Sequence, residues 1–322
     1  MKQYTIDENS GNQRLDRYLA KLMPLADRNF LQKMLRKKRI KLNGGRAEPK
    51  DTVHIGDTVQ VYFSEETIAG FQEKKPQRHF DLTPEIKKIF EPPVYEDDHL
   101  LVINKPAGLL SQADVSGDIS LIDAARTYLK KNTPGNTEAF DVVISNRLDR
   151  NTSGIILMPK DYPTLQAVNA AIRERQALKE YHTIVSGVLK KPGTLTGFLT
   201  KDTTENKSAI QSQSGKGAKE VRMDYCPLTD NGRFTLLEVT LHTGRSHQIR
   251  SQLTDYGFPI IGDYKYGDPS INRQFNQKYG LNHHLLHSRH YAIKDLGYDF
   301  TAPYPPLFKQ LLKDLKLDRE AF

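Results

Sequence analysis

Asp149 stands out chemically because it lies between two arginines, Arg147 and Arg150. A Thr-Ser-Gly turn follows at 152–154 and leads into an apolar run. Fixed cations beside a carboxylate favour its charged form, so this acid is suited to act as a nucleophile or a base. Taken alone, the pattern is more typical of a surface aspartate that ends a turn and pairs with an arginine. The rest of the chain must decide between the two interpretations.

A second segment with chemical potential is 242–253, where a strand turns into a helix through Gly244. The free backbone N–H groups at a helix N-terminus attract anions. Three side chains add donors and positive charge there: Arg245, His247 and Arg250. The segment therefore predicts an anion-binding site.

Four histidines lie close together near the C-terminus, at positions 283, 284, 287 and 290. A metal site is a possible interpretation, but neither a cysteine nor an ordered carboxylate accompanies them. We expect polar positions beside a strand over 285–293, and no metal.

The composition is that of a basic protein with a single cysteine. The 322 residues carry a net charge of +8, which suits a polyanionic partner such as RNA. Because Cys226 is the only cysteine, an intrachain disulfide and a cysteine-based zinc site are excluded. Neither a signal pattern at the N-terminus nor a membrane-length apolar run is present. We expect a cytoplasmic monomer.

Residues 1–65 predict a small domain with two helices and a basic surface. Leucines recur at helical spacing from Leu15 to Leu22, and a second helix follows through Leu31 and Leu35. Strands around 53–55 and 59–61 read as a hairpin closed by Gly-Asp. Six bases without an intervening acid predict phosphate contacts, although a solvated helix face is the alternative. They are Lys33, Arg36, Lys37, Lys38, Arg39 and Lys41.

The remainder divides into a linker over 66–92, rich in proline and charge, and a larger domain over 93–322. In the larger domain we expect helices over 120–129 and 162–175, and strands over 179–185 and 234–241. Residues 200–219 read as a mobile hairpin or loop whose lysines can touch phosphates.

Two resemblances emerge from these blocks. The N-terminal Arg-Leu-Asp at 14–16 and the turns at 41–44 and 56–59 resemble the small RNA-binding domain first described in a ribosomal small-subunit protein. Nearly the whole chain resembles the RluA-like family of pseudouridine synthases. Its motifs are Arg-Leu-Asp-x-x-Thr-Ser-Gly at 147–154, Lys-x-Tyr at 179–181, Gly-Arg-x-His-Gln-Ile-Arg at 244–250 and Gly-Asp-x-x-Tyr-Gly at 262–267.

The resemblance implies an α+β fold with a mixed, mostly antiparallel central sheet flanked by helices, beside the small N-terminal α/β RNA-binding domain. It implies isomerisation of uridine to pseudouridine in structured RNA, most often large-subunit ribosomal RNA, without a cofactor. Asp149 is then the catalytic carboxylate, Arg245 its partner, and Tyr181 the residue against the uracil. Arg147 fills the stack that the target base leaves. The other substrate-binding candidates are Thr152, Lys179, His247, Gln248, Ile249, Arg250 and Leu253.

Several positions depart from the family's usual pattern. Asn146 and Gln252 each stand where a histidine is common, and Ser111-Gln112 replaces a frequent His-Pro. These changes bear on which RNA is used more than on activity. The alternatives are an inactive RNA-binding or ribosome-assembly factor, a synthase acting on transfer RNA, and a glycosidase acting on small nucleosides.

Overall fold

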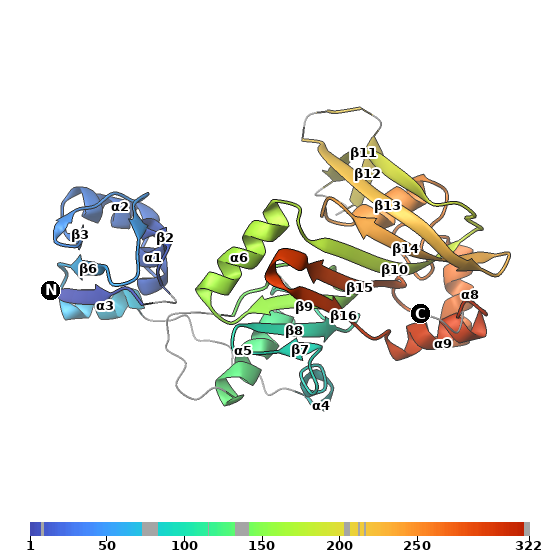
Figure 1. Ribbon diagram of the computed structural model, residues 1–322, viewed down its shortest axis with the longest axis horizontal. Coiled ribbons are helices and arrows are strands. Elements are labelled where there is room, and N and C mark those ends of the chain that lie inside the picture. Colours follow the sequence, from blue (N-terminus) through green and yellow to red (C-terminus); the bar gives the residue numbers. More distant parts are fainter. Residues whose placement is uncertain are drawn as a thin grey trace.

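The protein consists of two lobes, each with its own hydrophobic core (Figure 1). The computed structural model describes residues 1–7, 10–72, 83–114, 116–132, 142–202, 207–211, 213–215 and 217–318. The middle of the expected linker, 73–82, and part of the expected loop over 200–219 lie outside the described residues. No helix in these ranges is long and apolar enough to cross a membrane.

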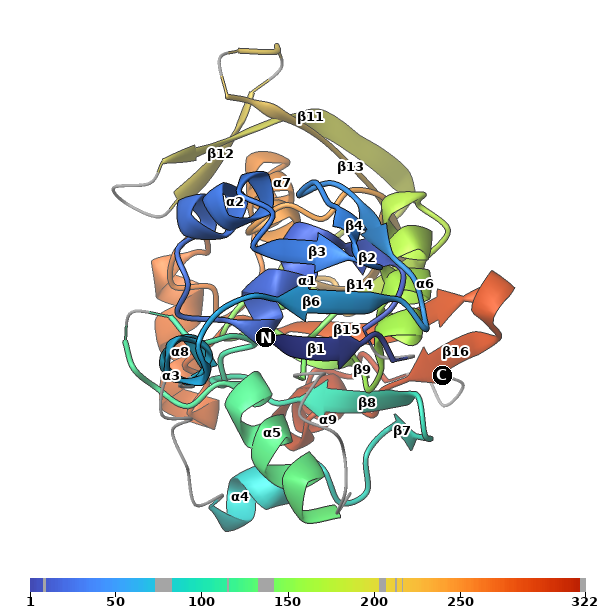
Figure 2. The same cartoon turned by 90° about the vertical axis from the view of Figure 1, so that its left-hand side faces the viewer.

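The N-terminal lobe packs two helices against a four-stranded sheet of order β1-β6-β3-β4 (Figure 2). The expected helices are present as α1 and α2, and their leucines enter the core because they share one face. The strands are β1 (Lys2–Thr5), β2 (Gln13–Arg14), β3 (Ile40–Leu42), β4 (Gly45–Arg46), β5 (Thr52–Val53) and β6 (Thr58–Val61); the helices are α1 (Leu15–Leu22), α2 (Arg28–Arg36) and α3 (Glu65–Gln72).

Two expectations for this lobe differ from the structure. β5 and β6 do not form the predicted hairpin: β5 pairs with β2, whereas β6 pairs with β1 and β3. The chain at Ile6 hydrogen-bonds both Gly56 and Asp57, so the turn between the two strands is anchored to β1 instead. The linker prediction also began too early, because Ile68 of α3 is buried in the N-terminal core.

The C-terminal lobe is built on a ten-stranded sheet in which β12-β11-β13-β14-β10-β15-β9-β8-β7 are successive neighbours and β16 also pairs with β15. Its strands are β7 (Tyr95–Glu96), β8 (Leu100–Lys105), β9 (Ser153–Pro159), β10 (Leu178–Ser186), β11 (Gly193–Asp202), β12 (Lys207–Gln211), β13 (Lys219–Asp230), β14 (Phe234–Leu241), β15 (Leu286–Ile293) and β16 (Tyr298–Thr301). Its helices are α4 (Pro84–Lys87), α5 (Leu121–Asn132), α6 (Tyr162–Arg173), α7 (Gln248–Asp255), α8 (Pro269–Tyr279), α9 (Pro306–Asp314) and the short η1 (Lys294–Leu296). The expected α+β fold with a mostly antiparallel sheet is confirmed.

Strand residues alternate between two apolar layers. Ile156 of β9 and Val239 of β14 pack with α5 and α7 on one face. Ile155 of β9 packs with α6 on the opposite face, where α8 and α9 cover Leu236 of β14. Successive side chains of a strand point to opposite faces. Tyr181 of β10 belongs to the layer under α5 and α7, which is therefore the face that carries the site.

Among the named strands described, β9 and β15 form the parallel pair, which meets at Ser153–His287 and Gly154–Ser288. Gly154 has φ +116°, and a Cβ there would lie 2.2 Å from the Ser288 carbonyl oxygen. Only glycine adopts this conformation without strain and permits so close an approach. The Thr-Ser-Gly turn thus brings the start of β9 directly against β15, and with it the loop that carries Asp149.

Candidate active site

A buried lysine, Lys105, holds the loop that carries Asp149. Lys105, at the end of β8, is fully buried and donates through Nζ to the carbonyl oxygens of Pro106, Leu109 and Arg150 at 2.8–2.9 Å. Burial lowers the pKa of Lys105 to about 7, against the opposing charge of Asp149. A buried donor is costly unless its hydrogen bonds are satisfied. Lys105 therefore connects the loop at 106–109 to the loop that contains Asp149 and Arg150.

Further side chains fix the same loop on both sides of Asp149. The Ser111 hydroxyl donates to the Leu148 carbonyl at 2.8 Å and accepts from the Leu148 N–H at 3.2 Å. Asn146 spans to β9, donating to Ile155 O at 2.9 Å and accepting from Leu157 N at 2.8 Å. The departures at 111 and 146 thus have a structural role here, because both side chains satisfy backbone groups next to the acid.

Two of the four clustered histidines hold the Thr-Ser-Gly turn. His284 Nε2 lies 2.8 Å from Thr152 Oγ1, and His287 Nδ1 lies 2.9 Å from Ser153 Oγ. Burial lowers the pKa of His284 to about 3 and that of His287 to about 4, so both rings are neutral at physiological pH. No group of His, Cys, Asp or Glu side chains suited to a metal ion occurs within the described ranges. His287 and His290 lie on β15, and His283 and His284 come shortly before it.

Asp149 is paired with Arg250, which comes from the first turn of α7. Arg250 Nη1 donates to Asp149 Oδ2 at 3.2 Å. The same guanidinium donates to both carboxylate oxygens of Asp263, from Nε at 2.7 Å and from Nη2 at 2.9 Å. Arg250 is buried and Asp263 is 1% exposed, whereas the Asp149 side chain keeps 28% of its surface open. One arginine therefore joins a structural carboxylate to the accessible one.

The electrostatics of this group favour its charged forms. Burial alone would raise the pKa of Asp263, but the hydrogen bonds and charge of Arg250 hold it below its ordinary value. Burial would likewise lower the pKa of Arg250, yet Asp263 and Asp149 together raise it. Backbone N–H groups of Lys265 and Tyr266 also donate to Asp263, which keeps its charge and orientation fixed.

His247 is a second basic side chain near Asp149. Its Nε2 is 3.8 Å from Asp149 Oδ2, and its Nδ1 is 2.9 Å from the Tyr266 hydroxyl. That hydroxyl also accepts from the Ser208 N–H at 2.7 Å, so Tyr266 connects His247 to β12. Burial lowers the pKa of His247 despite the nearby carboxylate. The backbone of His247 adopts the left-handed conformation, with φ 58°, immediately before the first residue of α7.

Tyr181 forms an apolar wall together with Ile249 and Leu253, all members of one buried layer. Burial raises the pKa of Tyr181 to about 12, and the charge of Asp149 acts in the same direction. The phenol therefore keeps its proton at neutral pH. Ile249 and Leu253 are buried, with 4% and 0% of their surfaces exposed.

Of the cations expected beside Asp149, neither Arg245, Arg147 nor Arg150 forms an ion pair with it among the described residues. Arg245 is exposed, and its side chain forms no ion pair with any described residue; only its backbone contacts Gln248. The predicted Asp149–Arg245 pair is therefore wrong in this structure, because Arg250 on α7 takes that place. Arg150 turns to Asp118 at 2.7 Å, while Arg147 is exposed. Lys179 is partly buried. Burial lowers the pKa of Lys179, and the charge of Arg175 acts in the same direction.

Gln248 and Gln252 support the turn into α7. Gln248 Oε1 accepts from the Thr243 hydroxyl at 2.9 Å and from the Arg245 N–H at 3.1 Å. Gln252 accepts from Gln248 Nε2 and donates to Leu195 O. Gln248 was expected to bind substrate, but these buried amides are already engaged with the protein, so they shape the loop that precedes Arg250.

Lys105, Asp263 and His284 were not among the expected site residues. A signal for Asp263 was present in the Gly-Asp-x-x-Tyr-Gly motif, although the motif alone does not indicate what its carboxylate does. Lys105 begins the segment Lys-Pro-Ala-Gly at 105–108, and its residue types do not predict that this lysine is buried. Its burial depends on the packing of β8 against β9, which local sequence does not reveal.

The basic residues of the N-terminal lobe gather at the end of α2 and in the following turn. Lys33, Arg36, Lys37, Lys38 and Arg39 are exposed, and Lys41 is partly buried with Nζ 5.3 Å from the centre of the Tyr62 ring. None of the six forms an ion pair with a carboxylate in the described part of the chain. Their charges therefore remain available to a polyanion.

Comparison with known proteins agrees with this architecture. The family model for RNA pseudouridylate synthase matches residues 99–255, and the model for the S4 domain matches residues 13–59. The synthase match, adjoined by an S4 domain, indicates the class of RNA-modifying isomerases.

Curated relatives cover most of the chain. "Ribosomal large subunit pseudouridine synthase C" of Rickettsia felis is 35% identical over 277 residues, covering 83% of this chain and 86% of that protein. The protein of the same name from Buchnera aphidicola (Schizaphis graminum) is 30% identical over 322 residues and covers 96% of each. This chain therefore belongs to the RNA pseudouridine synthase family.

A solved structure shares the fold. "Human RNA Pseudouridylate Synthase Domain Containing 4" superimposes with a TM-score of 0.61 at 23% identity, covering 72% of this chain and 95% of that one. The agreement concerns the arrangement of strands and helices that position the site.

Replacing Asp263 by asparagine tests the ion pair through which Arg250 joins Asp263 to Asp149. The amide places an N–H donor against the Arg250 donors, leaving a buried charge without its fixed counterpart. We expect the free energy of unfolding to fall by about 3 kcal/mol at neutral pH, as for other broken buried pairs. Because the folded pKa of Asp263 is depressed, its contribution is present above the ordinary aspartate pKa of about 4 and is lost as the pH falls below it.

Urea denaturation at several pH values measures this difference. Asp118→Asn is the matched control, since it removes an exposed carboxylate that pairs with Arg150 and should change stability little. The stabilising role of the Arg250–Asp263 ion pair would be contradicted if both variants lost the same free energy of unfolding. It would also be contradicted if the loss caused by Asp263→Asn did not become smaller at acidic pH.

Proposed function

We propose that this protein converts uridines of structured large-subunit ribosomal RNA to pseudouridine, with Asp149 as the essential carboxylate. The curated relatives, named for the large ribosomal subunit, support the choice of RNA. The observation that carries the proposal is Asp149 itself, accessible at 28% of its side-chain surface and held by a buried arginine. Such a substrate places the activity in the cytoplasm, and we propose that the protein acts as a monomer.

The reaction breaks the bond between C1′ and N1, turns the detached uracil and rejoins it through C5. It is neutral in redox terms and consumes no water, so its chemistry requires neither cofactor nor metal. Asp149 acts either by covalent attack on the sugar or base, or by removing a sugar proton. Both routes need an ionised, fixed carboxylate, and Arg250 supplies the charge and the orientation.

Tyr181 and its apolar neighbours receive the uracil. The phenol of Tyr181 is protonated at neutral pH because burial raises its pKa to about 12. Packing against the base is thus its primary role, and removal of the C5 proton by Tyr181 needs a relay that accepts the phenolic proton in the same step. Ile249 and Leu253 extend this wall, and exclusion of water strengthens the interaction between the reacting groups and Asp149.

The target base must leave its stack to reach this site. Arg147, exposed and two residues from Asp149, is placed to fill the vacated position. The basic surface of the N-terminal lobe binds the phosphates of the surrounding RNA. Both lobes thus bind the RNA, whereas the reaction takes place in the C-terminal lobe.

Asp149→Asn should abolish pseudouridine formation while leaving RNA affinity nearly unchanged. Loss of the catalytic carboxylate removes the reaction itself, an effect on the order of 10⁴-fold or more, whereas Arg250 keeps Asp263 as its partner. Product is measured by chemical mapping of pseudouridine in ribosomal RNA, and affinity by filter binding. Asp295→Asn, an exposed carboxylate outside the site, serves as the control. Turnover by Asp149→Asn near the wild-type rate would refute the assignment.

The basic surface is tested by replacing Arg36, Lys37 and Lys38 together with glutamine. Each phosphate that the protein no longer neutralises should reduce the slope of log affinity against log salt by about 0.7 to 0.9, so we expect a decrease of roughly 2. The matched control replaces Lys309, Lys313 and Lys316 by glutamine, which removes the same charge from exposed positions near α9. Identical slopes for both triple variants would mean that the α2 surface is merely solvated.

A further inference from the structure

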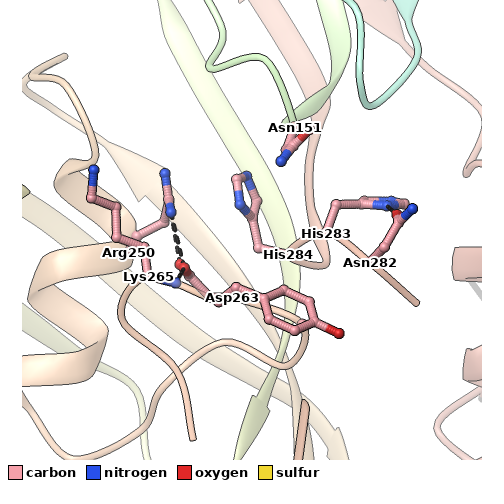
Figure 3. A pocket seen from close by; sticks show the side chains of 9 residues that line it. Asn151, Arg250, Asp263, Lys265, Asn282, His283 and His284 are labelled. Atoms are coloured by element: carbon pink, nitrogen blue, oxygen red, sulfur yellow. Dashed lines mark hydrogen bonds and ion pairs between the residues drawn. The ribbon is translucent and has the colours of Figure 1, made fainter. Parts of the chain in front are cut away.

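A cavity of about 450 Å³ is lined in part by Arg250, the residue that also donates to Asp149. Figure 3 shows Arg250 and Lys265 on one side of it, Asn282 and His283 on the other, and His284 with Asn151 between them. Neither Asp149 nor Tyr181 lines this cavity. It is therefore a neighbour of the proposed uracil site and not that site itself.

The cavity and the acid share their structural supports. Asn151 follows Asp149 by two residues in the loop held by Lys105. Arg250 lines the cavity and also donates to Asp149, so the cavity and the acid share this guanidinium. A ligand in the cavity would consequently lie against the group bound at Asp149, as one nucleotide lies beside the next in a strand.

The polar groups of the cavity suit a ligand that is anionic and rich in acceptors. Asp263 is the carboxylate in its lining, and it already accepts from Arg250 and from two backbone N–H groups. Lys265 contributes a positive charge, while Asn151 and Asn282 contribute amides. Burial lowers the pKa of His283, and the charge of Lys105 acts in the same direction, so its imidazole is neutral. A phosphate flanked by a ribose presents the matching acceptors.

An exposed aromatic ring stands at the rim. Tyr264 is 59% exposed, although its hydroxyl donates to the Leu281 carbonyl at 3.0 Å. That hydrogen bond fixes the ring while leaving much of its surface open to solvent. A fixed aromatic surface beside a cationic recess is the arrangement on which an unpaired base stacks.

We propose that this cavity binds the nucleotide adjacent to the target uridine, with its base stacked on Tyr264 and its phosphate near Lys265. The inference rests on the function proposed above and adds a subsite to it. Its volume falls in the range of sites that hold one small-molecule-sized group. Because stacking tolerates any base, the subsite selects for an unpaired, splayed nucleotide and thus for the local shape of the RNA.

The test compares Tyr264→Leu and Tyr264→Phe on an RNA stem-loop that the wild type modifies. Phenylalanine keeps the ring and leucine only the apolar bulk. Tyr264→Leu should raise KM about tenfold, within the range of base–aromatic stacking, with kcat nearly unchanged, and Tyr264→Phe should resemble the wild type. Tyr95→Leu is the matched control, because Tyr95 is also exposed and hydrogen-bonded through its hydroxyl, to Asp97.

The substrate is varied in parallel by placing an abasic site on either side of the target uridine. One of these should raise KM of the wild type about as much as Tyr264→Leu does, and should cost that variant nothing further. The proposal is overturned if Tyr264→Leu leaves KM unchanged. It is also overturned if Tyr264→Leu raises KM by the same factor on intact RNA and on each abasic RNA. Absence of wild-type turnover on any RNA would instead refute the proposed function, so the two failures are distinct.

Discussion

The shared arginine between Asp149 and Asp263 is the interaction on which the rest of the site depends. A buried guanidinium is stable only when it is paired and its donors are satisfied. Asp263 satisfies one edge of Arg250 and leaves Nη1 for Asp149. The accessible carboxylate is thereby fixed by a group that is itself fixed, which is the requirement for a preorganised site.

The surrounding fold exists in good part to bring three distant segments to this point. The Asp149 loop rests on Lys105 at the end of β8 and is drawn against β15 by Gly154. Arg250 is presented by the start of α7, which packs on the same face of the sheet as Tyr181. The Asp263 loop follows α7, and the hydroxyl of its Tyr266 joins His247 to β12. Rigid elements thus place the reacting groups, and loops supply the side chains.

Periodicity in the sequence was sufficient for most of the elements. β14 and the two N-terminal helices appear where apolar spacing predicts them. Pairing was less accessible: the expected hairpin of β5 and β6 does not form, because β1 competes for hydrogen bonds near Gly56. Hydrogen bonds between segments distant in sequence leave no local pattern. The overall topology therefore came from resemblance and not from periodicity.

In the site, too, residue types predict some features, whereas others depend on contacts between distant segments. Asp149 and Tyr181 are predicted from their motifs, and the charge of Asp149 adds to the burial that raises the pKa of Tyr181. The cation that partners Asp149 was assigned to Arg245, yet Arg245 and Arg250 differ by five residues across a helix start. Which of the two points inward depends on the αL conformation of His247 and on the packing of α7. Neither is readable from residue types, so motif membership alone could not distinguish them.

The most direct measurement compares Arg250→Lys with Arg245→Lys in single-turnover pseudouridine formation at saturating RNA. Lysine keeps the charge but lacks the planar fork that reaches two carboxylates at once. We predict that Arg250→Lys slows the reaction by about a hundredfold, the cost typical of a misplaced catalytic group, and that Arg245→Lys keeps nearly the wild-type rate. A slow Arg245→Lys enzyme beside a fast Arg250→Lys enzyme would contradict the account.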